Sequence, residues 1–271
     1  MQRAGHQVAL LAPNRAGAAL RGKGVGEVPE LFDWEGAEVA ALLAGEAPRG
    51  DPLQEHLRGC QGVLAYTRSA PLIESLQHRV PRVVVHDPDP RSVHASRWLA
   101  DPVRAWGGDP DPLPPPLTPN PQEQDAAAAF CGALPRGFLA LHPGSGAPAK
   151  TWPAERFQAL AAALSPDQPW LLVRGPAEPA VPPPRGAVVA SELPLRILGA
   201  VLARAGLYVG NDSGVSHLAA AAGAPTLALF GPTAPEVWSP LGSRVVTLRA
   251  PGGAMSEISV DEVAAKAAPL R

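Results

Sequence analysis

The feature that most limits the possible folds is an apolar segment that runs into a turn of small residues and then into a helix pattern. Residues 206–209 are the apolar segment, residues 210–214 are the turn, and residues 215–222 have the pattern of a helix. Short apolar strands followed by helices are typical of a parallel sheet covered on both faces. The backbone N–H groups and dipole at the start of such a helix favour an anion, typically a phosphate.

Three polar residues at this turn are candidates for ligand contact. Asp212 and Ser213 can cap the helix or bind ligand hydroxyls, and Gly214 leaves the backbone accessible. His217 lies one turn into the helix, on the side near its first residues. The alternative is that Asp212 or Ser213 is only an N-cap and that His217 is a surface residue.

A second loop favours the binding site over that alternative. It follows an apolar segment at residues 138–141, contains Gly144, Ser145 and Gly146, and ends at Lys150. Glycines let the backbone approach a ligand closely, the serine supplies a hydroxyl donor, and the lysine supplies a positive charge for a phosphate. Because the chain has only three lysines, a lysine here points to a function. The alternative for this loop alone is a surface turn with a solvated lysine.

A proline-rich segment at residues 109–119 separates two halves of the chain. Its prolines remove backbone donors, so it cannot form a helix or a central strand. We therefore predict two α/β domains, residues 1–120 and residues 121–271. In the first half we expect strands at 8–12, 62–66 and 82–85 and helices at 37–43, 72–78 and 93–106. In the second half we expect strands at 138–141, 170–173, 187–190, 207–209, 226–230 and 244–248, with helices between most of them.

Composition excludes several classes of protein. The net charge is −2 and no basic stripe is present, so we expect no nucleic-acid partner. No apolar run is long enough to span a membrane and no signal peptide opens the chain, which predicts a cytoplasmic protein with at most peripheral contact with an inner membrane. Cys60 and Cys131 form no metal-binding pattern, and we expect both to be reduced.

Two weaker patterns receive structural interpretations. Residues 22–26 are glycine-rich, but no convincing strand precedes them, so a flexible loop is favoured over a dinucleotide-binding fingerprint. Residues 86–90 read His-Asp-Pro-Asp-Pro, and an Asx-type turn is favoured over a metal site.

The two loops, in their order and spacing, resemble glycosyltransferase family 9, which includes the lipopolysaccharide heptosyltransferases. The resemblance covers roughly residues 138–240. It is carried by residues 142–146 (His-Pro-Gly-Ser-Gly), 150–153 (Lys-Thr-Trp-Pro), 211–219 (Asn-Asp-Ser-Gly-Val-Ser-His-Leu-Ala), 223–226, 229–233 and 235–240. A weaker match lies in the first half, at residues 5–11 and 94–107.

The resemblance implies two Rossmann-like domains of the GT-B type and the transfer of a heptose-like sugar with inversion. The donor would be an ADP- or UDP-linked sugar held mainly by the second domain, and the acceptor a lipopolysaccharide-type or other glycan or glycolipid. The donor site would comprise Gly144, Ser145, Gly146, Lys150, Glu178, Asp212, Ser213, Gly214 and His217, with Glu178 near the ribose. We expect no cofactor and no metal, because a lysine and a helix dipole can stabilise the leaving diphosphate.

The family also places a strand and a glycine-rich loop, which carries the catalytic base, before the segment that matches Met1. We therefore expect an incomplete N-terminal domain with one short sheet that begins at residues 8–12, and we assign no catalytic residue. Two other functions remain open. One is a nucleotide-sugar-binding protein without transferase activity, and the other is a sugar-nucleotide epimerase on the same two-domain plan.

Overall fold

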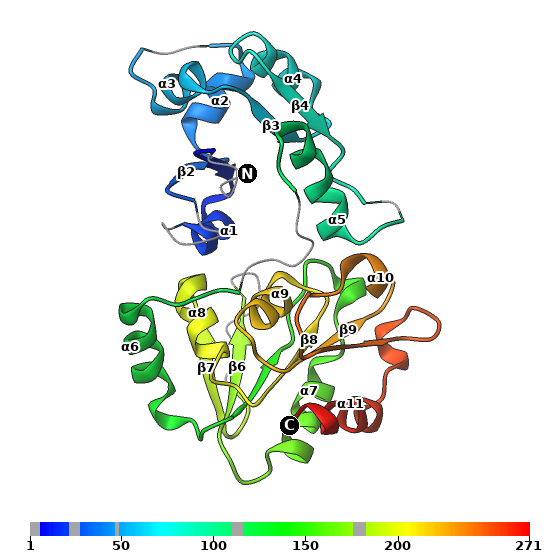
Figure 1. Cartoon of the computed structure of the whole chain (residues 1–271). Coiled ribbons are helices and arrows are strands. Elements are labelled where there is room, and N and C mark those ends of the chain that lie inside the picture. The colour runs from blue at the N-terminus through cyan, green and yellow to red at the C-terminus, as the bar shows by residue number, and fades with distance from the viewer. Residues whose placement is uncertain (1–5, 22–27, 47–48, 91, 110–115, 176–182) are drawn as a thin grey trace. The chain divides into compact units, whose positions relative to one another are not determined.

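The structure is a computed structural model that describes residues 6–21, 28–46, 49–90, 92–109, 116–175 and 183–271. The chain divides into two compact units, Met1–Pro112 and Leu113–Arg271 (Figure 1). Each unit has its own hydrophobic core. Glu178 and the glycine-rich residues 22–26 lie outside the described residues.

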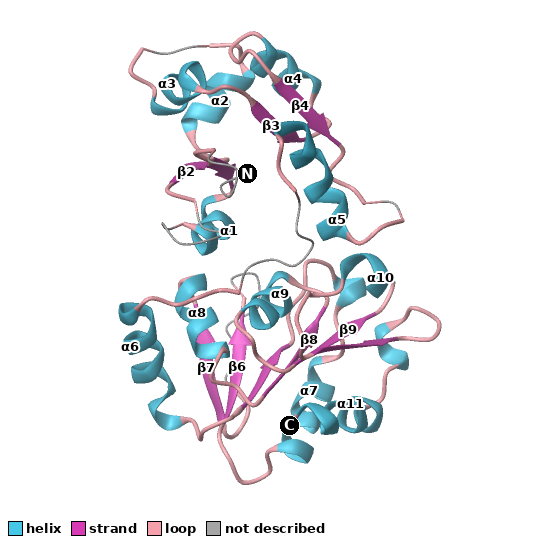
Figure 2. Cartoon of the chain, in the orientation of Figure 1, coloured by secondary structure: helices cyan, strands magenta, loops and turns pink. Residues whose placement is uncertain are grey.

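The second unit is built on a six-stranded parallel sheet (Figure 2). Its strands are β5 (Leu139–His142), β6 (Trp170–Arg174), β7 (Ala187–Ser191), β8 (Leu207–Asn211), β9 (Thr226–Phe230) and β10 (Val245–Arg249). They lie in the order β10-β9-β8-β5-β6-β7, which is the doubly wound Rossmann order. The sequence prediction of a parallel sheet is confirmed, and each of the six predicted strands overlaps an observed one.

Helices cover both faces of this sheet because alternate strand residues point to opposite sides. Leu139 and Leu141 belong to a core with α7 (Ala154–Leu164) and α11 (Val260–Ala267). Ala140 belongs to the opposite core. That core includes residues of α6 (Pro121–Phe130), α8 (Leu195–Leu202) and α9 (Gly214–Ala221), and a further short helix is α10 (Pro235–Trp238). Strands β5, β8 and β9 are buried along their whole length.

The sequence patterns did not predict α6. The helix is rich in alanine and buries only Ala127, so it has no clear apolar stripe. Its start is instead fixed by a capping box, in which the Asn120 side chain accepts from the Glu123 N–H and the Glu123 carboxylate accepts from the Asn120 N–H. Arg196 on α8 then donates to the same carboxylate, at 2.5 Å, which ties α6 to α8.

The first unit contains two separate parallel pairs of strands in its described residues. β1 (Ala9–Ala12) pairs with β2 (Glu30–Asp33), and β3 (Val63–Tyr66) pairs with β4 (Val83–His86). The expectation of one short sheet is therefore wrong. The side chains of β1 and β3, together with apolar residues of the surrounding helices, line a cavity of about 580 Å³.

The first unit has five α-helices in its described residues, and the buried residues of α2, α3 and α4 share one core. The five helices are α1 (Asn14–Gly17), α2 (Ala37–Leu43), α3 (Pro52–Gly59), α4 (Ala70–Gln77) and α5 (Ala95–Ala100). The predicted helix at 93–106 is corrected, because it becomes a 3-10 helix from Asp101 to Trp106. Pro102 lacks the N–H that the α-helical ladder needs at this point. Strand β2 and helices α1 and α3 were not predicted.

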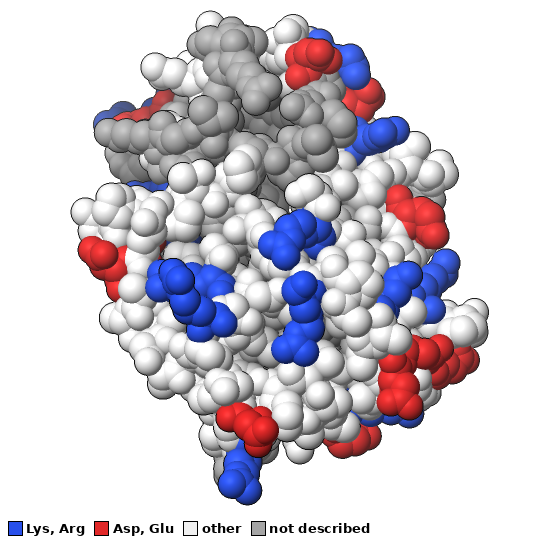
Figure 3. All heavy atoms as spheres, turned by 60° about the horizontal axis from the view of Figure 1, so that its bottom comes forward, with Lys and Arg blue, Asp and Glu red and all other residues white. Residues whose placement is uncertain are grey.

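Charged side chains on one face of the molecule are shown in Figure 3. Lys and Arg stand in separate groups with uncharged surface between them, and Asp and Glu lie toward the edges of that face. In the described part of the chain, no helix is both long enough and apolar enough to cross a bilayer. Cys60 is partly exposed and Cys131 is buried, and both are free thiols.

Candidate functional site

The two predicted binding loops leave neighbouring strands of the second unit. β5 pairs with β8, and the pairing runs to His142 opposite Gly210, next to the point where each loop begins. The strand order reverses between β5 and β8, because β6 and β7 lie on one side of this pair and β9 and β10 on the other. This reversal is the topological switch point, where sheets of this kind bind their ligands at the carboxyl ends of the strands.

Lys150 and Asp212 form an ion pair that joins the two loops. Lys150 Nζ lies 3.2 Å from Asp212 Oδ2, and their side chains are 25% and 10% exposed. The same carboxylate oxygen accepts a hydrogen bond of 2.8 Å from Thr233 Oγ1. Thr233 lies in the loop after β9, so three adjacent strand ends contribute to one polar cluster. In this structure Lys150 neutralises a carboxylate that would otherwise repel a phosphate.

Ser145 uses its hydroxyl inside its own loop. Its Oγ donates to the Ala147 carbonyl at 2.7 Å and lies 2.7 Å from Thr151 Oγ1, which itself reaches the same carbonyl. The side chain therefore holds the shape of the loop, and its backbone remains the part best placed to meet a ligand. Gly144 is buried and Gly146 is exposed.

Helix α9 begins with backbone donors that no side chain caps. Ser213 occupies the N-cap position, but its hydroxyl accepts no capping bond. The N–H groups of Gly214 and Val215 are among those for which helix geometry provides no intrahelical acceptor. A Cβ built at Gly146 or at Gly214 meets no atom within 4 Å, so there is open space beside both loops. His217 is exposed on the first turns of the helix.

Two residues of this cluster were not singled out by the sequence patterns as site residues. Asn211 is fully buried at the end of β8, and its side chain contacts both ends of the loop that carries Lys150. Thr233 holds the Asp212 carboxylate. Both lie in segments that match the family, but their roles depend on contacts between distant loops, which local patterns do not show.

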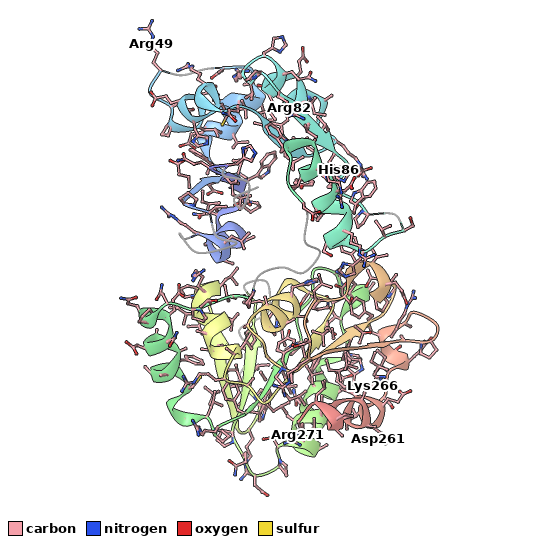
Figure 4. The ribbon with its side chains drawn as sticks, viewed as in Figure 1. Arg49, Arg82, His86, Asp261, Lys266 and Arg271 are labelled. Carbon is pink, nitrogen blue, oxygen red and sulfur yellow. The ribbon has the colours of Figure 1, made fainter. Side chains whose placement is uncertain are left out.

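The first unit presents no comparable cluster in its described residues. The backbone N–H of Asp89 donates to Asp87 Oδ1 at 3.0 Å, so the predicted Asx-type turn is confirmed. Arg68 forms ion pairs with the carboxylates of Asp87 and Asp89, at 2.5 and 2.9 Å. His86, labelled in Figure 4 at the end of β4, packs against Trp98 with the two rings tilted and their centroids 4.5 Å apart. In the described part of the chain, no group of three or more His, Cys, Asp or Glu side chains is arranged to hold a metal ion.

Comparison with known proteins identifies similar sequences. The model of glycosyltransferase family 9 (heptosyltransferase) matches residues 68–267, a range that includes both loops and α9. Lipopolysaccharide heptosyltransferase 1 of Escherichia coli O18:K1:H7 is 35% identical over 75 residues, which are 28% of this chain and 23% of that protein. Lipooligosaccharide heptosyltransferase 2 of Haemophilus influenzae is 41% identical over 49 residues, 18% of this chain and 14% of that protein. The matches therefore span less than a quarter of the length of these curated relatives.

Solved structures share the fold along nearly the whole chain. A family 9 glycosyltransferase from Veillonella parvula has a TM-score of 0.74 at 18% identity, covering 96% of this chain and 86% of its own. The E. coli ADP-heptose heptosyltransferase II has a TM-score of 0.70 at 21% identity, covering 96% and 88%. An E. coli heptosyltransferase solved with ADP has a TM-score of 0.66 at 17% identity, covering 97% and 90%. These likenesses confirm the predicted GT-B type of fold.

Proposed function

Since the chain belongs to glycosyltransferase family 9, we propose that it transfers a heptose-like sugar from a nucleoside-diphosphate donor to a glycan acceptor, with inversion at the sugar carbon. The observation that carries this proposal is the position of Lys150 and the uncapped start of α9 on two adjacent loops at the switch point. A lysine charge and free backbone donors beside open space suit a diphosphate. Because the curated relatives match only in part, the activity of the whole protein is part of the proposal.

The diphosphate would lie between Lys150 and the N–H groups at the start of α9. Lys150 would then move its contact from Asp212 to the phosphates, and Asp212 would keep its hydrogen bond from Thr233. Charge builds on the diphosphate as it leaves, so donors that are already in place stabilise the transition state more than the ground state. Asp212 would accept hydrogen bonds from hydroxyls of the sugar, and His217 would donate to the diphosphate.

The proposed sugar transfer is a single displacement at the anomeric carbon. The acceptor hydroxyl oxygen forms a bond to the anomeric carbon on the face opposite the diphosphate. The bond between that carbon and the diphosphate oxygen breaks, and its electron pair leaves with the diphosphate. The hydroxyl proton passes to a general base, to which we assign no residue.

Binding and turnover test this proposal separately. ADP is the first nucleotide to examine, because one structure with the same fold was solved with it, and UDP is the second. We expect calorimetry to detect binding of ADP or UDP. We also expect the release of the nucleoside diphosphate from its heptose-linked form to require a glycan acceptor. If the protein binds neither ADP nor UDP, the proposed donor site is overturned.

The first unit supports a second candidate, a nucleotide-sugar-binding protein without transferase activity. Its described strands form two separate pairs beside a cavity, whereas the donor-side sheet is continuous. The unit that would bind the acceptor therefore has the less continuous strand pairing. Tight donor binding with no acceptor-dependent release of diphosphate would favour this candidate.

A further inference from the structure

One buried side chain closes the base of the loop that carries Lys150. Asn211 is 0% exposed at the end of β8. Its Nδ2 donates to the Pro143 carbonyl at 2.6 Å and reaches the Gly144 carbonyl at 3.4 Å. Its Oδ1 accepts from the Trp152 backbone N–H at 3.1 Å. The NH2 group of one amide therefore holds the start of the loop, and the oxygen of the same amide holds its end.

A primary amide supplies both the donor and the acceptor that this pattern needs at neutral pH. Two carbonyl oxygens on one side require a donor, and an N–H on the other side requires an acceptor, so the partners themselves fix the orientation of the Asn211 amide. A carboxylate of the same shape would place an oxygen against the Pro143 carbonyl. An apolar side chain would leave the Trp152 N–H and the Pro143 carbonyl without these partners in a buried place.

The surroundings of Asn211 are also held in place. Its backbone carbonyl accepts a 2.5 Å hydrogen bond from Ser216 Oγ on α9. At the far end of the loop, Trp152 is fully buried and its indole N–H donates to the Ile258 carbonyl at 2.9 Å. The residue that directly follows β8 is Asp212, the partner of Lys150. Asn211 thus lies at the junction of the lysine loop, the Asp212 turn and α9.

We propose that Asn211 is a positioning residue that fixes Lys150 at the distance from the start of α9 that a diphosphate requires. Asn211 itself does not touch the ligand. Without the amide bridge the loop would have to be ordered when the ligand binds, and the cost would appear as lower affinity. This inference rests on the proposed donor site, since it concerns the phosphates that Lys150 would contact.

The test compares Asn211→Leu and Asn211→Asp with Thr226→Val. Thr226 is fully buried at the opposite end of the neighbouring strand β9, and its hydroxyl donates to the Ala224 carbonyl, so it controls for loss of a buried hydrogen bond. In Asn211→Leu we expect ADP affinity to fall at least about tenfold and AMP affinity to change by less than about threefold, because AMP lacks the second phosphate. Thr226→Val should leave both affinities unchanged.

Amide hydrogen exchange followed by NMR gives a readout that needs no ligand. The backbone N–H of Trp152 should lose its protection from exchange in Asn211→Leu and keep that protection in Thr226→Val. In Asn211→Asp the protection should return as the pH is lowered from about 8 to about 5, because a buried carboxyl has a raised pKa and its protonated form can both donate and accept. Asn211→Leu has no group that could restore it.

The outcomes separate the two proposals. Wild-type protection of Trp152 in Asn211→Leu would overturn the positioning role. Equal losses of ADP and AMP affinity would also overturn it, because the effect would then be general destabilisation. If the wild-type protein binds neither ADP nor UDP, the proposed function fails, and the exchange measurement alone decides whether Asn211 fixes the loop.

Discussion

Lys150 Nζ lies 3.2 Å from Asp212 Oδ2 although 62 residues separate the two in the chain. The pair links the loops after β5 and β8, and it brings opposite charges to the place where we propose that a diphosphate binds. Each residue therefore changes what the other can do. The cation offsets the carboxylate, and the carboxylate holds the cation close to α9 until a ligand replaces it.

Replacing Lys150 should weaken nucleotide-diphosphate binding. In Lys150→Ala we expect ADP affinity to fall by about 1.5–3 kcal/mol, because one charge-assisted contact is lost and Asp212 is left unpaired beside the phosphates. The double variant Lys150→Ala/Asp212→Asn should recover part of that loss, since the repulsive charge is gone. Calorimetry on the two single variants and the double variant measures the coupling. Unchanged affinity in Lys150→Ala would contradict the assignment.

Replacing Asp212 should change recognition of the sugar without weakening recognition of the nucleotide. Asp212→Asn keeps the shape of the side chain but removes its charge, so we expect binding of free ADP to stay the same or to tighten. The preference among ADP-linked sugars should decrease, because the amide has lost one acceptor oxygen for hydroxyls. Competition between donor sugars measures this preference. Equal loss of free ADP and ADP-sugar binding would instead indicate a structural role for Asp212.

Two glycines test how closely a ligand approaches the loops. A Cβ at Gly146 or Gly214 has no neighbour within 4 Å, so Gly146→Ala and Gly214→Ala should fold with unchanged melting temperature. If phosphates pack against these backbones, ADP affinity should fall by about tenfold, or about 1.4 kcal/mol. Gly132→Ala is the control, because its Cβ also meets open space and it lies outside the candidate site. Full affinity in both site variants would place the ligand elsewhere.

The two units should differ in local stability. Strands β5, β8 and β9 are fully buried in a six-stranded sheet, whereas β1 has no fully buried residue and, within the described part of the first unit, pairs with β2 alone. Two-stranded sheets are marginal without further support, so we expect β1–β4 to exchange amide hydrogens with opening free energies several kcal/mol below those of the larger sheet. Hydrogen-exchange mass spectrometry at constant pH measures this. Equal protection in both units would contradict the expectation.

Stability should depend on the ionisation of Glu123. Burial raises the pKa of this carboxyl, but hydrogen bonds from Arg196 and from the Asn120 backbone outweigh it, so the pKa lies below its usual range. A lowered folded-state pKa stabilises the fold above the unfolded-state pKa, and this contribution is lost as the pH falls through the folded-state value. Glu123→Gln should therefore reduce the free energy of unfolding by about 2 kcal/mol at neutral pH and by much less in acid.

Glu262 is the matched control for that measurement. It occupies the same capping-box position on α11, where it accepts from Ser259, and it is exposed. Glu262→Gln should cost less than Glu123→Gln in urea unfolding at neutral pH, because surface interactions of this kind are weak. Equal effects of the two substitutions would show that the cap, and not the contact with Arg196, makes Glu123 important.

The sequence by itself determined the parallel sheet of the second unit and the residues of its two loops. Short apolar runs that alternate with helix patterns, such as residues 226–230 after the helix at 215–222, predict strands buried on both faces, and this strand forms as predicted. Local patterns did less well where the apolar signal is weak. The alanine-rich α6 and the short strand β2 were missed because capping and pairing, and not an apolar stripe, hold them in place.

Only the tertiary structure decided which of these residues meet. Strand order follows from the packing of the whole sheet, and that order places β5 beside β8 and so brings Lys150 to Asp212. The amide of Asn211 and the hydroxyl of Thr233 gain their roles from partners in other loops. Likewise, β1 and β3 line the same cavity although they lie far apart in the chain. A sequence pattern records neighbours along the chain, whereas these relationships join segments that only the folded sheet brings together.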